Sequence, residues 1–209
     1  MRKLKKYFLS IIFLFIVALH AVASEKIDIH INKGLLNIPV YLDETENNRG
    51  VALTISFDKN VLKAIDGSLK KGILINDYKV ETGLFSEGNL SLGIYPFHEK
   101  YPTKGVICYL QFYSFGEIGS STTIEFSKFE SNNVPVNTPD SGGFFVNGRT
   151  WDILNVIITP PEFKDAIVNL QMLSSFQANT LTFFTDMNHD EKTGIEDVIY
   201  ILNDIVHRN

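Results

Sequence analysis

The residues of this chain best suited to chemistry lie close to its C-terminus, in the stretch TDMNHDEKTGIEDVIYIL. Oxygen-bearing side chains stand at every second position there, at Asp186, Asn188 and Asp190, and another carboxylate follows at Asp197. Carboxylate and amide oxygens are the ligands that hard divalent cations prefer. Zinc is disfavoured, because His189 has no cysteine or second histidine beside it in the loop. The stretch therefore predicts a calcium site.

The spacing is that of a twelve-residue calcium loop of the EF-hand type, whose ligands stand at positions 1, 3, 5, 7, 9 and 12. Counted from the first acid, these positions are Asp186, Asn188, Asp190, the Lys192 carbonyl, Gly194 and Asp197. A water would complete the sphere at Gly194, which has no side chain. Position 6, usually glycine, is Glu191, and a left-handed non-glycine residue costs about 1 kcal/mol, so the expected affinity is lower. The alternative is an acidic surface turn that leads into a capped helix.

Two short helices are expected, one on either side of this loop. After Pro160-Pro161 the chain reads EFKDAIVNLQML, where apolar residues return at the helical spacing i, i+3, i+4 and i+7. They are Phe163, Ala166, Ile167, Leu170 and Leu173. The stripe of the second helix, which begins near Ile195, consists of Val198, Ile199, Leu202, Ile205 and Val206. Each helix is too short to be stable alone, so we expect an antiparallel pair in which the stripes pack against each other.

The two helices also repeat each other in sequence. When FKDAIVNLQML is aligned on IEDVIYILNDI, Asp165 falls on Asp197, Ile167 on Ile199 and Leu170 on Leu202. The twelve residues that end at Asp165, LNVIITPPEFKD, offer no ladder of oxygen ligands. One ion site, rather than two, is therefore expected.

From Lys26 to about Gly148 the pattern is that of β-strands. Segments such as KIDIHI, VALTISF, VICYLQFYSF and TTIEFSKF alternate apolar and polar residues, and turn sequences such as DKN, EGN and GEIGS separate them. This pattern predicts a mainly β fold, a β-sandwich with one face of each sheet buried. Cys108 is the single cysteine, so it forms no internal disulfide; we expect a small buried apolar residue rather than a nucleophile.

The N-terminus has the features of a targeting sequence. Basic residues at positions 2, 3, 5 and 6 precede the apolar run FLSIIFLFIVALHAV, and the small-residue signature Ala21-Val22-Ala23 closes the segment. This order is typical of a secretory signal peptide, residues 1–23; an uncleaved membrane anchor is the alternative, but the run is short and ends in a cleavage signature. Cleavage removes four of the 19 basic residues and none of the 24 acidic ones, leaving a net charge of −9. We therefore expect a secreted acidic protein with no membrane span and no nucleic-acid partner.

Two family resemblances follow from these stretches. The helix pair with DMNHDEKTGIEDVIYIL resembles dockerin modules, in which calcium loop–helix repeats form the docking surface for a cohesin. IPVYLDE, GVALTISFDKNVLKAID, GVICYLQFYSF and GSSTTIEFSKFES resemble the cohesin family, whose antiparallel jelly-roll sandwich is shared with several carbohydrate-binding modules; Lys59 stands where cohesins commonly have proline. The resemblance implies a cohesin-like sandwich over 24–149, a linker over 150–160 and a dockerin-like helix pair over 161–209.

The resemblance implies an exported, non-catalytic module for calcium-dependent protein–protein docking, as in polysaccharide-binding or polysaccharide-degrading assemblies. The expected partners are exported proteins that carry cohesin or dockerin modules, a second copy of this chain included. Carbohydrate binding by the sandwich is the alternative, through rings in GIYPFHEKYP that stack on sugars unless they pack in the core: Tyr95, Phe97, His98 and Tyr101. An enzyme is not expected, because HExxH, GxSxG and a phosphate loop are missing and no pattern marks a glycosidase carboxylate pair.

Overall fold

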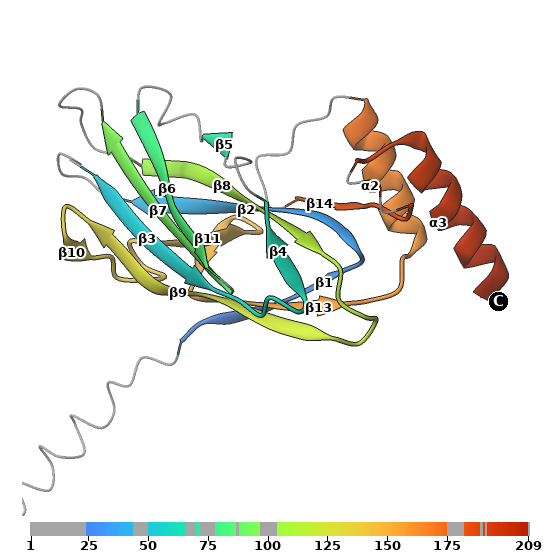
Figure 1. Ribbon diagram of the computed structural model, residues 1–209, viewed down its shortest axis with the longest axis horizontal. Coiled ribbons are helices and arrows are strands. Elements are labelled where there is room, and N and C mark those ends of the chain that lie inside the picture. The colour runs from blue at the N-terminus through green and yellow to red at the C-terminus, as the bar shows by residue number, and fades with distance from the viewer. Residues whose placement is uncertain are drawn as a thin grey trace, which may run out of the picture.

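The computed structural model describes residues 24–43, 50–65, 70–71, 78–86, 88–96, 104–174, 182–188, 190 and 192–208. The predicted signal peptide and three of the candidate sugar-binding residues, Phe97, His98 and Tyr101, lie outside them. The described part is mainly β, with two sheets facing each other and two helices beside one end of the sheets (Figure 1). No helix in this part is long and apolar enough to cross a membrane.

The first sheet has the strand order β1-β13-β9-β3-β7-β6, with β10 paired to β9. Its strands are β1 (Lys26–Ile31), β3 (Val51–Ser56), β6 (Tyr78–Ser86), β7 (Asn89–Pro96), β9 (Ser121–Ser131), β10 (Val134–Pro135) and β13 (Ile153–Ile158). β1 and β13 run parallel, and the other pairs are antiparallel. The expectation of a wholly antiparallel sandwich is thus wrong at this edge, where the long chain between the two strands permits parallel pairing.

The second sheet has the order β12-β11-β2-β8-β4, with β5 paired to β8 and β14 paired to β2. Its strands are β2 (Gly34–Asp43), β4 (Leu62–Ala64), β5 (Lys70–Lys71), β8 (Lys104–Ser114), β11 (Gly142–Val146), β12 (Arg149–Trp151) and β14 (Thr182–Thr185). β8 pairs with the whole length of β2, so β11 and β14 share its other edge, β11 at residues 40–42 and β14 at residues 34–37. A jelly roll describes these two sheets only loosely.

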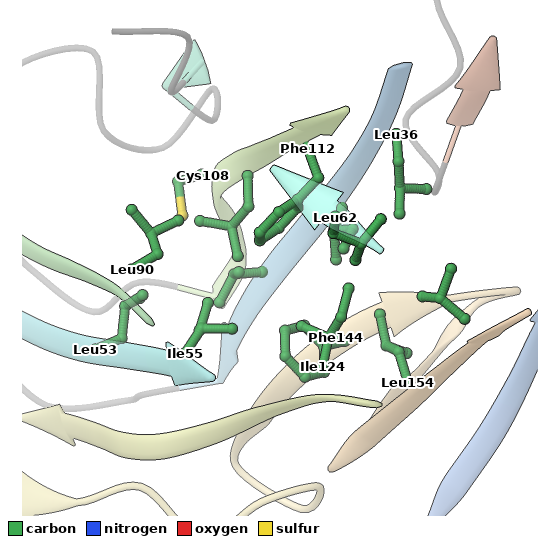
Figure 2. Close-up of a cluster of buried hydrophobic side chains, with 14 of the residues drawn as sticks. Leu36, Leu53, Ile55, Leu62, Leu90, Cys108, Phe112, Ile124, Phe144 and Leu154 are labelled. Atoms are coloured by element: carbon green, nitrogen blue, oxygen red, sulfur yellow. The ribbon is translucent and has the colours of Figure 1, made fainter. Parts of the chain in front are cut away.

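The core lies between the sheets because alternate residues of each strand point inward. In β3, for example, Val51, Leu53 and Ile55 are buried while the residues between them are partly exposed. Figure 2 shows buried side chains from both sheets meeting in this core, among them Ile124 and Phe112. Each fully buried side chain of this size contributes about 1.5–3 kcal/mol to the stability of the sandwich.

Cys108 is fully buried in the same core, as predicted from its place in an alternating strand. Its burial raises the pKa of the thiol from 9.0 to about 12, since a thiolate is poorly solvated among apolar side chains. A thiol held protonated in this way is not a nucleophile at neutral pH.

The two predicted helices are present as α2 (Phe163–Leu173) and α3 (Ile195–Arg208). The prediction of a linker over residues 150–160 is wrong for most of its length. Residues 150–151 belong to β12, and residues 153–158 form β13, which is paired on both sides. The physical reason is the alternation of Leu154, Val156 and Ile158, which are all buried, so the sandwich continues to Ile158.

Candidate metal loop and helix face

The predicted ion loop connects β14 to α3. Asp186 follows directly after β14, and Asp197 lies in the first turn of α3. Both carboxylates are buried, each with 1% of its surface exposed, whereas Asn188 and Asp190 between them are exposed. The structure therefore places two of the predicted ligands inside the molecule and two at its surface.

Asp197 connects the two ends of the loop. Its Oδ1 accepts hydrogen bonds from the amides of Met187 (2.8 Å) and Asn188 (3.3 Å), and its Oδ2 accepts one from the amide of Gly194 (2.8 Å). Gly194 precedes the helix and Asp197 is its third residue, so the last bond is the carboxylate half of a capping box. All three donors are backbone amides, so hydrogen bonds at the N-terminus of α3, rather than an ion pair with any of the described residues, hold the buried carboxylate.

Asp186 is connected to the sandwich. Its Oδ2 accepts a hydrogen bond from the Tyr113 hydroxyl of β8 (2.7 Å), and its amide donates to the Lys33 carbonyl (3.0 Å). Its Oδ1 accepts a bond from the amide of Asp190 (3.3 Å), within the loop. Tyr113 was not among the predicted site residues, because it stands 73 positions earlier and no local pattern relates it to the loop.

Asn188, Asp190 and Lys192 form the exposed side of the loop. The side-chain oxygen of Asn188 accepts a bond from the Asp190 amide (3.1 Å), and that of Asp190 accepts one from the Lys192 amide (3.0 Å). Bonds of this kind, from an amide two residues further on, are Asx turns, and they turn the side-chain oxygens toward the loop's own backbone. Two further positions of the loop, His189 and Glu191, lie outside the described residues.

The loop's fit to a calcium ion is good in ligand type and incomplete in arrangement. Every predicted ligand atom is a hard oxygen, and two of the predicted ligands are buried carboxylates, the kind of group that a hard cation binds. In the described part of the chain, however, no three Asp, Glu, His or Cys side chains converge closely enough to hold a metal ion. An ion in this loop would therefore also need the oxygen atoms of Asn188 and of the Lys192 carbonyl.

The helix pair has a small core. Ala166, Val198 and Ile201 are buried, and Met187 and Ile205 pack partly buried against them. The helical face that α2 buries is otherwise polar, because it carries Asp165 and Asn169.

The predicted packing of the two apolar stripes is wrong for most of their residues. One stripe on each helix is instead between 38% and 70% exposed. We call these stripes together the helix face: Phe163, Ile167, Leu170 and Leu173 on α2, and Ile195, Ile199, Leu202 and Val206 on α3. The physical reason is that the helices meet along residues one position away from the stripes, such as Ala166 and Val198, and polar partners cover the rest of the buried side of α2.

The predicted repeat extends to the contacts of the two helices. Asp165 accepts a hydrogen bond from the Glu162 amide (2.6 Å), just as Asp197 accepts one from the Gly194 amide. The residues that follow, Ala166 and Val198, are both buried in the small core. Residues at equivalent positions of the two repeated helices are therefore exposed to solvent.

The candidate sugar-binding residues are represented in the described chain by Tyr95 alone. Its side chain is 46% exposed, but its ring lies over Gly93 of the same strand, where an added Cβ would lie 2.7 Å from a ring carbon. The ring thus covers the backbone of β7, which is a packing role.

No family model matches this chain, and no curated protein matches it. Among solved structures it is similar to a non-cellulosomal cohesin of Archaeoglobus fulgidus (13% identity, 65% of this chain and 88% of the other, TM-score 0.43). It is also similar to the third cohesin of ScaC from Acetivibrio cellulolyticus, solved with the ScaB dockerin (12% identity, 65% and 96%, TM-score 0.46). A third similar structure is the Coh-OlpA–Doc918 cohesin–dockerin complex of Clostridium thermocellum (15% identity, 65% and 95%, TM-score 0.45). The likeness is one of fold.

Proposed function

We propose that this chain is an exported, non-catalytic docking protein whose helix face binds a partner protein. The observation that carries the proposal is the exposure of one apolar stripe on each helix, with Phe163 62% and Val206 70% exposed. Single exposed apolar residues are common, but two stripes at helical spacing mark an interaction site because water contact with so many apolar side chains is unfavourable. The partner we propose is an exported cohesin-like sandwich protein, a second copy of this chain included.

The docking is proposed to depend on calcium in the loop before α3. The ligands would be Asp186, Asn188, Asp190, the Lys192 carbonyl and Asp197. The ion would neutralise the two buried carboxylates and join the end of β14 to the start of α3. At free calcium one hundred times the dissociation constant, it would stabilise the folded chain by about 2.7 kcal/mol.

The calcium site is tested by the change Asp186→Ala in the full chain. Titration calorimetry of the wild type is expected to show binding of one calcium ion, and chelation is expected to lower its melting temperature. The variant is expected to bind no calcium and to melt at the same temperature with and without chelator, because it lacks a buried ligand. If titration of the wild type with millimolar calcium gives no heat of binding, the proposed calcium site is wrong.

The docking face is tested with the paired changes Ile167→Lys and Ile199→Lys. Both residues are exposed, so the substitutions add charge to the helix face without disturbing the core. The immobilised wild type is expected to retain an exported partner in calcium and release it in chelator, and the double variant is expected to retain none. Partner identity comes from mass spectrometry, and the dissociation constant is then measured with the purified partner.

The matched control is Val134→Lys, which changes another exposed apolar residue, in β10, at the end of the sandwich far from the helices (Figure 1). It is expected to bind the partner like the wild type. Equal binding by the helix-face double variant would rule out the helix face, and retention of the wild type on insoluble polysaccharide would favour carbohydrate binding instead.

A further inference from the structure

Buried polar side chains join the helix pair to the sandwich. Asn32, between β1 and β2, donates from Nδ2 to Asp165 Oδ2 at the start of α2 (2.9 Å) and accepts at Oδ1 from the Thr185 hydroxyl at the end of β14 (2.9 Å). Asn169 of α2 bonds both backbone groups of Thr185, its Nδ2 donating to the carbonyl (2.8 Å) and its Oδ1 accepting from the amide (3.1 Å). These four side chains are at most 9% exposed. Together they fix how α2 and β14 sit on the sandwich.

The ion loop begins at the same junction. The strand before it, β14, adds to the edge of β2, with Thr185 opposite Gly34. The next residue, Asp186, receives the Tyr113 hydroxyl on its side chain and gives its amide to Lys33. The sandwich therefore holds the first predicted ligand by its side chain, by its amide and by the strand that precedes it.

The two halves of the repeat are completed in different ways. At α3, the carboxylate of Asp197 bonds amides of the loop itself. At α2, the matching carboxylate of Asp165 bonds Asn32 of the sandwich in addition to the Glu162 amide. At α2, a side chain of the sandwich therefore supplies the second hydrogen bond to the carboxylate, whereas at α3 the amides of the loop supply it.

From this arrangement we propose that Tyr113 is a positioning residue for the calcium loop, and that the loop and the sandwich form one cooperative unit. Calcium bound at Asp186 would then stabilise the sandwich as well as the helices. This inference rests on the proposed calcium site. Tyr113 acts through Asp186, since its hydroxyl holds the carboxylate in one orientation, and loss of such an outer hydrogen bond weakens metal binding about 10- to 100-fold.

The first test compares Tyr113→Phe with Tyr109→Phe in the full chain. Both tyrosines are half-buried in β8, and the described residues give the Tyr109 hydroxyl no bond to the loop. Titration calorimetry is expected to show calcium binding at least about tenfold weaker in Tyr113→Phe and unchanged in Tyr109→Phe. Matching circular dichroism spectra without calcium establish that both variants fold.

The second test uses Cys108 as a reporter of the sandwich. It is the only cysteine of the chain and is fully buried, so a thiol reagent reaches it only when the sandwich opens. If loop and sandwich open together, calcium at one hundred times its dissociation constant slows labelling of Cys108 about 100-fold. In the Asp186→Ala variant, Cys108 is expected to be labelled at the same rate with and without calcium.

The outcomes separate this inference from the proposed function. A wild type that binds calcium, with Tyr113→Phe binding equally well, overturns the role of Tyr113 and leaves the calcium site standing. Calcium binding without any slowing of Cys108 labelling overturns the cooperative unit. A wild type that binds no calcium overturns the site and this inference with it.

Discussion

Asp165 and Asp197 occupy the same position in two repeated helices and make the same bond to the amide that precedes the helix. They differ in their second partner, which is a side-chain amide of the sandwich for Asp165 and the loop's own backbone for Asp197. A carboxylate at this position also interacts favourably with the positive end of the helix dipole. One residue type therefore serves both as a helix cap and as a connection to a neighbouring structure.

At the residue scale, the thiol of Cys108 makes the free energy of unfolding depend on pH above pH 9, and the change Cys108→Ala is expected to remove this dependence. Burial raises the thiol pKa from 9.0 to about 12, so the folded chain keeps a proton that the unfolded chain loses above pH 9. The thiol's contribution to stability is complete below pH 9 and falls by about 1.4 kcal/mol per pH unit toward pH 12.

Urea denaturation of both proteins between pH 8 and 10.5 measures this difference. The wild type is expected to be more stable at pH 8, because the alanine leaves a cavity in the core. The difference in the free energy of unfolding between the wild type and Cys108→Ala is expected to become smaller above pH 9. A constant advantage over this range would mean that the thiol also loses its proton in the folded chain.

At the scale of elements, α2 holds β14 in place in addition to its partner strand β2. Asn169 is fully buried and bonds both the amide and the carbonyl of Thr185. Asn169→Ala leaves these two backbone groups without that partner, so we expect the free energy of unfolding to fall by about 2–4 kcal/mol. The control is Asn203→Ala on the exposed side of α3, expected within about 0.5 kcal/mol of the wild type. Chemical denaturation measures both; equal effects would contradict the role of Asn169.

The elements themselves were largely predictable from the sequence. The alternation of strands such as β3 and the helical spacing after Pro160-Pro161 correctly predicted a mainly β chain followed by two helices. β13 falls within the predicted linker although Leu154, Val156 and Ile158 alternate as clearly as the buried residues of β3. β14 is only four residues long, which is too short for a pattern to reveal.

The environment of those elements was less predictable. Helical spacing identifies an apolar stripe such as Ile195, Ile199 and Leu202, but it does not tell whether another element covers the stripe, and here none of the described elements does. The contact between Tyr113 and Asp186 has no local signal, because it depends on how the end of β8 meets the end of β14. The ligand spacing from Asp186 to Asp197 identified the loop, and calcium in it stays a prediction.

At the scale of the whole molecule, sandwich and helix pair are expected to unfold together. β14 belongs to the second sheet, and the polar junction at Asn32 is buried, so separating the two parts would expose both. Scanning calorimetry of the full chain is expected to give one transition whose calorimetric and van't Hoff enthalpies agree. Two transitions, with only the lower one moved by calcium, would mean that the helix pair melts on its own.

The sharing of one edge of β2 between β11 and β14 has a consequence for folding in time. The residues of β14 are synthesised after all the other described strands of the second sheet, so the edge of β2 at Gly34–Asn37 stays without this partner strand until they emerge. A bare strand edge of this kind pairs readily with other chains. Chains cut short before Thr182 are therefore prone to aggregate even though most of their core residues are present.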